Sequence, residues 1–218
     1  MIRRFAIIIS DKGKALCRAA LIVLCLLGLQ GISMPTAMAA QKTVDAPAAV
    51  ILHFHAVLLS VMQRANKLGY KGRYAKLEPE IRKAYDLPMV ARLTLGKAWS
   101  KLNSKQRAQF VGIFSRLVIA TYAHNFDGYS GEKFNNVSQQ RLDPDQVVIN
   151  TLLSRRNGDN VQLDYVLRQS HGKWKIINVV ADGASDLALK RADFTAVLRH
   201  LGFPVLLKKL EGKIAQYQ

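Results

Sequence analysis

The apolar residues of this 218-residue chain change their spacing twice, and this restricts the fold more than any other feature. Up to about residue 125 they recur every three or four positions, as on one face of a helix. Between residues 133 and 181 they alternate, as on one face of a strand. From residue 185 the helical spacing returns. Helices over about 45–125, strands over about 133–181 and helices over about 185–217 predict an α+β domain.

Residues suited to capping or ending a helix divide the two helical stretches. Gly69 and Gly202 are suited to ending helices, and Ser185 is suited to capping one. Pro47 and Pro88 fit the first turns of two others. The expected helices are 45–68, 74–85, 86–99, 103–125, 185–201 and a last one beginning at Phe203 or Pro204.

Turn sequences divide the alternating stretch into four strands. The run 157–160, Asn-Gly-Asp-Asn, is a strong signal for a tight hairpin, and turns are also expected at 143–145 and 171–173. Strands joined by consecutive hairpins form an antiparallel meander. The sequence predicts a curved four-stranded antiparallel sheet covered on one face by the N- and C-terminal helices. Its strands are expected at 133–142, 146–156, 161–168 and 174–181.

The first 39 residues follow the order of a secretory signal peptide. Arg3 and Arg4 give a basic start, the run 19–29 is almost wholly apolar, and residues 37–39 read Ala-Met-Ala. The apolar run is about half of the ~20 residues that span a bilayer. We therefore expect cleavage near Ala39, leaving one domain over 40–218 outside the cytoplasm. A short N-terminal membrane anchor is the alternative.

Removal of that segment changes the chemistry of the chain. Both cysteines, Cys17 and Cys25, would be lost, so the mature protein would have no disulfide and no thiolate ligand or nucleophile. Five basic residues and one acidic residue would also be lost, which lowers the formal net charge from +17 to +13. Such a surface favours transient contact with anionic membranes or an acidic partner, although the charge can serve solubility alone. Nucleic acid is not expected, because the basic residues are dispersed and no zinc-finger or RNA-binding motif is present.

No catalytic or metal-binding motif is complete in the sequence. In the run 128–131, Gly-Tyr-Ser-Gly, the second glycine comes one residue too early for a nucleophile elbow, and the run follows a helix rather than a strand. His53 and His55 are two positions apart, so on a helix they point in different directions. We therefore expect no enzyme activity, no metal and no cofactor. The remaining histidines are isolated: His124, His171 and His200.

Apolar and aromatic side chains are concentrated on three elements that are expected to face one another. In an ordinary domain they fill the core, whereas a sheet and helices that do not close leave an apolar cavity for a lipid. Periodicity does not distinguish the two arrangements. The residues that would line such a cavity are Phe110, Phe114, Val118, Tyr122, Val161, Leu163, Tyr165, Leu167, Phe194 and Leu198.

Several stretches resemble the MlaC (toluene-tolerance, Ttg2D-type) family of periplasmic lipid-binding proteins. Residues 172–185 match its pattern G-x-W-x-I-x-x-V-x-x-x-G-x-S, and 161–165 is similar to the strand before it. Residues 68–74 and 122–134 resemble the hopanoid-associated HpnM branch. The resemblance covers about 48–215. Its helix motifs match here at Asp86, Ala91, Leu95, Gly96 and Trp99, and then at Phe110, Phe114 and Val118.

The resemblance implies a periplasmic carrier that holds the acyl chains of a phospholipid or a hopanoid between sheet and helices. It also implies exchange of that cargo with an inner-membrane ABC-transporter complex and with an outer-membrane complex. One alternative is a secreted lipid-modifying enzyme on a similar fold, with Asp164, His124 and Ser130 as its candidate residues. Another is a structural adaptor with a solid core.

Overall fold

The computed structural model describes residues 46–156 and 160–218. The expected signal peptide, its cleavage site and residues 157–159 of the expected hairpin turn lie outside these ranges. No helix in the described ranges is both long and apolar enough to cross a membrane. The elements are α1 Pro47–Gln63, α2 Ala65–Ala84, α3 Leu87–Leu95, the 3-10 helix η2 Gly96–Lys101, α4 Ser104–Asn125, β1 Lys133–Asp143, β2 Gln146–Ser154, β3 Val161–Ser170, β4 Lys173–Ala181, β5 Ala184–Ser185, α5 Asp186–Leu201 and α6 Phe203–Ala215.

Side chains at three helix starts bond to the backbone N–H groups that the first turn leaves without helical partners. At α3, the Asp86 carboxylate accepts from the third residue of the turn at 3.0 Å. At α4, Asn103 and Gln106 form a reciprocal capping box with bonds of 2.9 and 3.0 Å. At α5, the Ser185 hydroxyl accepts at 3.1 Å. These caps lie at positions where the sequence indicates helix starts.

The first two helices are divided differently from the expectation. The helix expected over 45–68 ends at Gln63, because Arg64 leaves helical geometry with φ −112° and ψ 13°. Arg64 also donates from Nε to the carbonyl of Ser60 at 3.1 Å. α2 then begins at Ala65 and is kinked at Gly69, whose φ of 58° lies in the region that favours glycine. Gly69 therefore interrupts the helical path as expected, but inside α2 rather than at the end of α1.

The strands form one antiparallel sheet in the order β1-β2-β3-β4-β5. This confirms the α+β class and the antiparallel sheet, but the described sheet has five strands rather than four. The fifth, β5, has two residues, and Ala184 pairs with Ala181 after a tight turn at Asp182 and Gly183. Both turn residues have positive φ, 48° and 84°. A strand of two residues is too short to show alternation, so periodicity does not reveal it.

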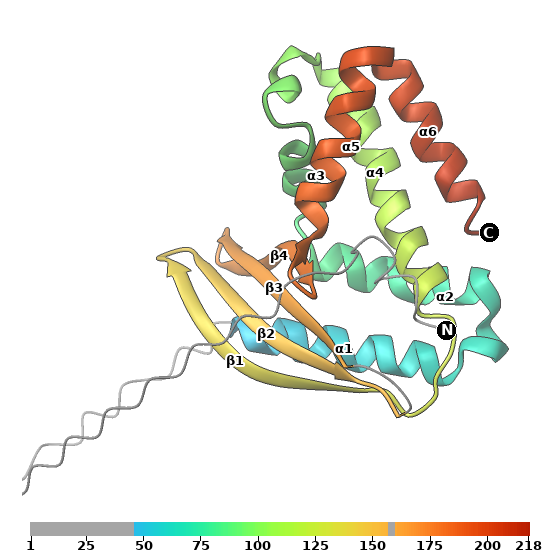
Figure 1. Cartoon of the computed structure of the whole chain (residues 1–218), viewed down its shortest axis with the longest axis vertical. Coiled ribbons are helices and arrows are strands. Elements are labelled where there is room, and N and C mark those ends of the chain that lie inside the picture. Colours follow the sequence, from blue (N-terminus) through green and yellow to red (C-terminus); the bar gives the residue numbers. More distant parts are fainter. Residues whose placement is uncertain (1–45, 157–159) are drawn as a thin grey trace, which may run out of the picture.

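Alternate residues of β2 and β3 are buried, whereas β1 is almost entirely exposed. In β2 the buried positions are Val147, Ile149, Thr151 and Leu153. Figure 1 shows α1 running along the curved sheet, while α3, α4, α5 and α6 are grouped beyond one end of it. The buried face of the sheet and the apolar faces of the helices share one continuous core cluster.

Candidate functional site

A small apolar pocket lies where the end of α4 meets the sheet. Its interior volume is only about 10 Å³, far below the roughly 300–1,000 Å³ typical of ligand pockets. Among the residues that the structure describes, buried side chains pack between helices and sheet, and the expected apolar cavity is not shown there. The pocket is lined by Tyr122, Phe126, Leu153, Arg155, Val161, Leu163, Tyr165 and Val179.

Four of the ten residues expected to contact lipid line this pocket: Tyr122, Val161, Leu163 and Tyr165. Three others form an aromatic cluster within the helical part, where Phe114 stacks on Phe110 at 6.0 Å and Phe194 meets both rings edge-on. Val118 and Leu167 are buried elsewhere in the core, and Leu198 is half-buried against it. The role of all ten residues in lipid contact stays a prediction.

The other four lining residues are missing from the sequence-based set. Two lie just beyond elements, since Phe126 follows α4 and Arg155 follows β2. A sequence signal for Arg155 does exist: Thr151 and Leu153 face the core, and continued alternation places residue 155 on the same face. A basic residue at an inward-facing position is unusual, because a buried charge is costly unless it is paired.

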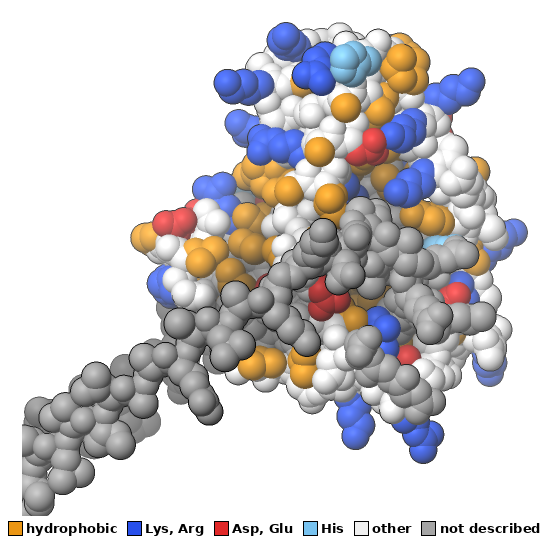
Figure 2. Space-filling view, in the orientation of Figure 1, with side chains coloured by type: hydrophobic (Ala, Val, Ile, Leu, Met, Phe, Trp, Pro, Cys, Tyr) orange, Lys and Arg blue, Asp and Glu red, His pale blue; other side chains and the backbone are white. Residues whose placement is uncertain are grey.

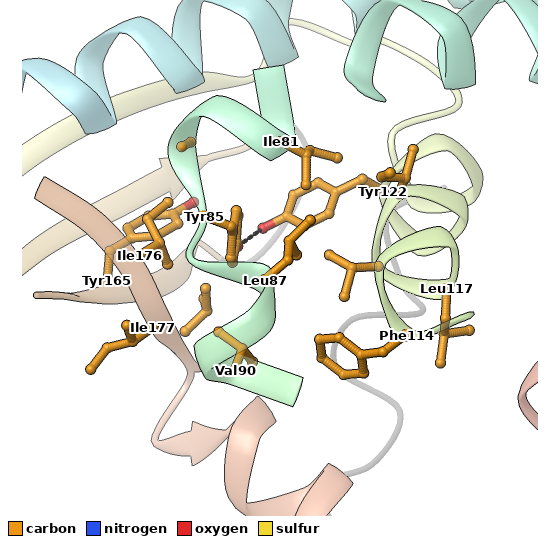
Figure 3. Packing of buried hydrophobic residues seen from close by; sticks show 14 of the residues in the cluster. Ile81, Tyr85, Leu87, Val90, Phe114, Leu117, Tyr122, Tyr165, Ile176 and Ile177 are labelled. Atoms are coloured by element: carbon orange, nitrogen blue, oxygen red, sulfur yellow. Dashed lines mark hydrogen bonds between the residues drawn. The ribbon is translucent and has the colours of Figure 1, made fainter. Parts of the chain in front are cut away.

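Buried aromatic side chains form the pocket wall and the core beside it. Figure 3 shows Tyr85 and Tyr122 pointing toward one another, with Tyr165 on the sheet side. The hydroxyls of Tyr85 and Tyr122 are 2.5 Å apart and share a hydrogen bond. The Tyr165 hydroxyl is hydrogen-bonded to Nε2 of His55 at 3.1 Å, and the His55 ring stacks on Phe134.

This polar wall is uncharged at neutral pH. Burial raises the pKa of Tyr85, Tyr122 and Tyr165 well above the ordinary value, so all three hydroxyls stay protonated. Burial also lowers the pKa of His55 to about 3, so its imidazole is neutral. The tyrosine and histidine side chains thus form two hydrogen-bonded pairs, Tyr85 with Tyr122 and Tyr165 with His55, and place no charge beside the apolar surface.

The charged side chain on the pocket wall is Arg155. Its Nε and Nη2 atoms are buried and have no hydrogen-bond partner among the residues that the structure describes. The six ion pairs found within those residues do not include it. The pocket therefore combines apolar and neutral polar walls with one half-buried arginine, whose Nε and Nη2 atoms have no partner among the described residues.

The candidate catalytic residues contact separate partners. The Ser130 hydroxyl donates to Glu132 at 2.8 Å, and Asp164 accepts from the amide of Asn150 at 2.9 Å. The ring of His124 stacks on Tyr217 with centroids 4.5 Å apart. The structure does not bring Ser130, Asp164 and His124 together in the pocket.

The two neighbouring histidines of α1 point in different directions, as their spacing predicts. His53 is largely exposed and bonds to Glu80 at 2.8 Å, whereas His55 is buried against Tyr165. Within 46–156 and 160–218, no group of three histidine, cysteine, aspartate or glutamate side chains is placed to hold a metal ion.

Acidification is expected to destabilise the protein through His55. The pKa of His55 is about 3 in the fold against 6.5 ordinarily, so between these values the unfolded chain binds a proton that the folded chain does not. The stability is therefore full above about pH 6.5 and falls as the pH falls toward 3. The loss between pH 7 and pH 4 is about 3 kcal/mol.

Urea unfolding across this pH range measures the effect. His55→Gln is expected to lose this component of the pH dependence, whereas His53→Gln is expected to keep it, because the side chain of His53 is 54% exposed. Equal pH slopes for the wild type and His55→Gln would contradict the assignment.

Comparison with known proteins supports the fold and identifies the protein family. A family model described as MlaC protein matches residues 54–212, well over half of the chain. Among solved structures, the chain is similar to a phospholipid-binding protein from Ralstonia solanacearum, determined in complex with a phospholipid. The two are 20% identical with a TM-score of 0.69, over 78% of this chain and 97% of the other, which shows a shared fold. No curated protein matches the chain at a significant level. From the family match, the chain belongs to the MlaC protein family.

Proposed function

We propose that the protein is a periplasmic carrier that shelters the acyl chains of a phospholipid in the pocket between α4 and the sheet. The observation that carries the proposal is this apolar pocket in a chain of the MlaC family. The Ralstonia solanacearum protein of the same fold is described as phospholipid-binding, which supports the choice of cargo. No bond is made or broken in this function.

The energetics favour such a role. Removing apolar surface from water is worth about 25 cal/mol per Å². Sheltering an acyl chain can therefore contribute many kcal/mol of binding free energy without a hydrogen bond or ion pair to the lipid. The tyrosine hydroxyls and His55 beside the pocket are uncharged and bonded to one another, so they cost little when a chain lies nearby. The pocket has to widen to admit an acyl chain, since its present space is small.

The basic surface suits delivery to anionic membranes. Figure 2 shows lysine and arginine side chains spread over the visible face, including the end of the molecule that α5, α6 and η2 form. Each basic residue near an anionic membrane contributes about 1 kcal/mol of attraction. We propose that this end meets membranes, and that an inner-membrane ABC-transporter complex and an outer-membrane complex exchange the cargo. The exposed residues there include Lys97, Lys101, Arg199, Lys208, Leu201 and Val205.

A transfer assay tests the proposal. Donor vesicles carry labelled phospholipid, acceptor vesicles carry none, and the purified protein is added between them. We expect the protein to speed transfer in proportion to its concentration, and to act faster on anionic acceptors at low salt than at high salt. A parallel set of donors carries a labelled hopanoid. Transfer no faster than in buffer for both cargoes would contradict the carrier function.

A lipid-modifying enzyme gains no support from the positions of its candidate residues. Ser130, Asp164 and His124 each contact another side chain, as described above. The transfer assay also separates the two functions, because an enzyme would change the mass of the labelled lipid and a carrier would not.

A further inference from the structure

Arg155 is brought into the pocket by the strand before it. Thr151 and Leu153 are fully buried on the inner face of β2, and Arg155 continues the same alternation one residue beyond the strand. Leu153 pairs with Val161 of β3, so Arg155 lies beside the end of a well-ordered ladder. The next residue, Arg156, is exposed. The two adjacent arginines thus differ in exposure, since Arg155 is half-buried.

The buried part of Arg155 is the part best suited to bind an anion. Nε and Nη2 lie on one edge of the planar guanidinium, and this edge matches two oxygens of a phosphate or carboxylate. Both atoms are buried and lack a hydrogen-bond partner among the described residues. Asp127 also has a buried oxygen without a partner there, but no ion pair within 4.0 Å joins it to Arg155.

The pocket that Arg155 lines indicates what kind of anion this edge would take. The remaining lining side chains are aliphatic or aromatic, with neutral tyrosine hydroxyls as their polar atoms. A free inorganic anion would gain nothing from these walls, whereas an amphiphile would use both the walls and the cation. The combination therefore fits a ligand with a long apolar part and a negatively charged group of two or more oxygens.

We propose that the Nε and Nη2 edge of Arg155 binds the phosphate of a phospholipid whose acyl chains occupy the pocket. This inference rests on the proposed carrier function and adds its selectivity. It assigns the protein to phosphate-bearing lipids over uncharged lipids with the same chains, such as diacylglycerol. It also favours phospholipid over an uncharged hopanoid as the cargo.

Uptake from vesicles tests the inference in four proteins: wild type, Arg155→Gln, Arg155→Lys and the matched control Arg156→Gln. Vesicles contain equal amounts of phosphatidylglycerol and diacylglycerol with identical chains, and mass spectrometry gives the ratio that each protein takes up. A hydrogen-bonded charged group typically changes affinity by about 10- to 100-fold. We expect Arg155→Gln to lower phosphatidylglycerol uptake by that factor with diacylglycerol uptake unchanged. Arg155→Lys should fall between, since it keeps the charge but loses the paired edge, and Arg156→Gln should match the wild type.

Urea unfolding of lipid-free protein, refolded after denaturing extraction, separates recognition from a structural role. Because Nε and Nη2 are buried without a partner among the described residues, Arg155→Gln should be at least as stable as the wild type. A clear loss of stability would overturn the inference, because it would make Arg155 a structural residue. Competition by inorganic phosphate or glycerol 3-phosphate as strong as that by phospholipid would overturn it in favour of a free anion.

The outcomes for wild type keep the two proposals apart. Uptake of neither lipid would end the carrier function and this inference with it. Equal uptake of both lipids, or an unchanged ratio in Arg155→Gln, would leave the carrier function standing and overturn the role of Arg155 alone.

Discussion

Replacing Leu163 with aspartate is expected to remove nearly all bound lipid from the protein. Leu163 lines the pocket, is 5% exposed and lies in the middle of the sheet between Thr151 and Ala181. An aspartate there would put a charge against the acyl chains, at a cost of about 2.5–3.5 kcal/mol in a hydrocarbon environment. The lipid affinity should therefore fall about 100-fold. Mass spectrometry of lipid per folded protein after vesicle uptake measures the loss.

Two further variants control this experiment. Leu142→Asp makes the same chemical change on β1, where Leu142 is 50% exposed, and should hold lipid normally. Leu163→Phe adds bulk without charge, so it should reduce lipid uptake by filling the pocket while the fold is retained. If Leu163→Asp and Leu163→Phe both fold and hold lipid as the wild type does, the acyl chains do not lie in this pocket.

Replacing Phe114 with alanine is expected to cost the fold about 3–5 kcal/mol, the usual range for a fully buried phenylalanine. Phe114 has no exposed surface, stacks on Phe110 and meets Phe194 edge-on at 6.4 Å. For a chain of this size such a loss lowers the melting temperature by about 10 °C. Thermal and urea unfolding measure it. A cost below about 1 kcal/mol would contradict the tight packing of this cluster.

The same variant tests where the lipid lies. Phe114 does not line the pocket, so the surviving folded protein should hold lipid normally. Phe114→Leu, which keeps most of the apolar volume, should lose less than about 1.5 kcal/mol and serves as the control. Lipid loss in folded Phe114→Ala would extend the binding region along α4, as the sequence-based set of lining residues predicts.

Local signals in the sequence account for most of the fold. The change of period separates helices from strands, and Asn103 and Ser185 cap helices where their positions indicate. Two features escape such signals. Arg64 ends α1 although the apolar period continues beyond it, and β5 is too short to have a period.

The candidate site is predictable only in part, because periodicity gives the face of an element and not the position along it. Tyr122 lines the pocket, whereas Phe110, on the same helix, does not. The two residues are twelve positions apart on the helix, which is about 18 Å. On β3 the prediction is more accurate. Val161, Leu163 and Tyr165 all line the pocket, because they occupy one short stretch of strand.

The family resemblance is confirmed at the level of MlaC. The HpnM branch, the hopanoid cargo and the signal peptide stay predictions. Of these, the choice of cargo bears most on the chemistry of the pocket, since Arg155 fits a phosphate and not an uncharged lipid.

The central claim is that the folded protein carries phospholipid, and lipid that co-purifies with it tests this most directly. The protein is exported to the periplasm of a Gram-negative host, purified without detergent, extracted with organic solvent and examined by mass spectrometry. We predict phospholipid in near-stoichiometric amount, reduced in Leu163→Asp and unchanged in Leu142→Asp. Wild-type protein that is folded, free of lipid and unable to acquire lipid from vesicles would contradict the claim.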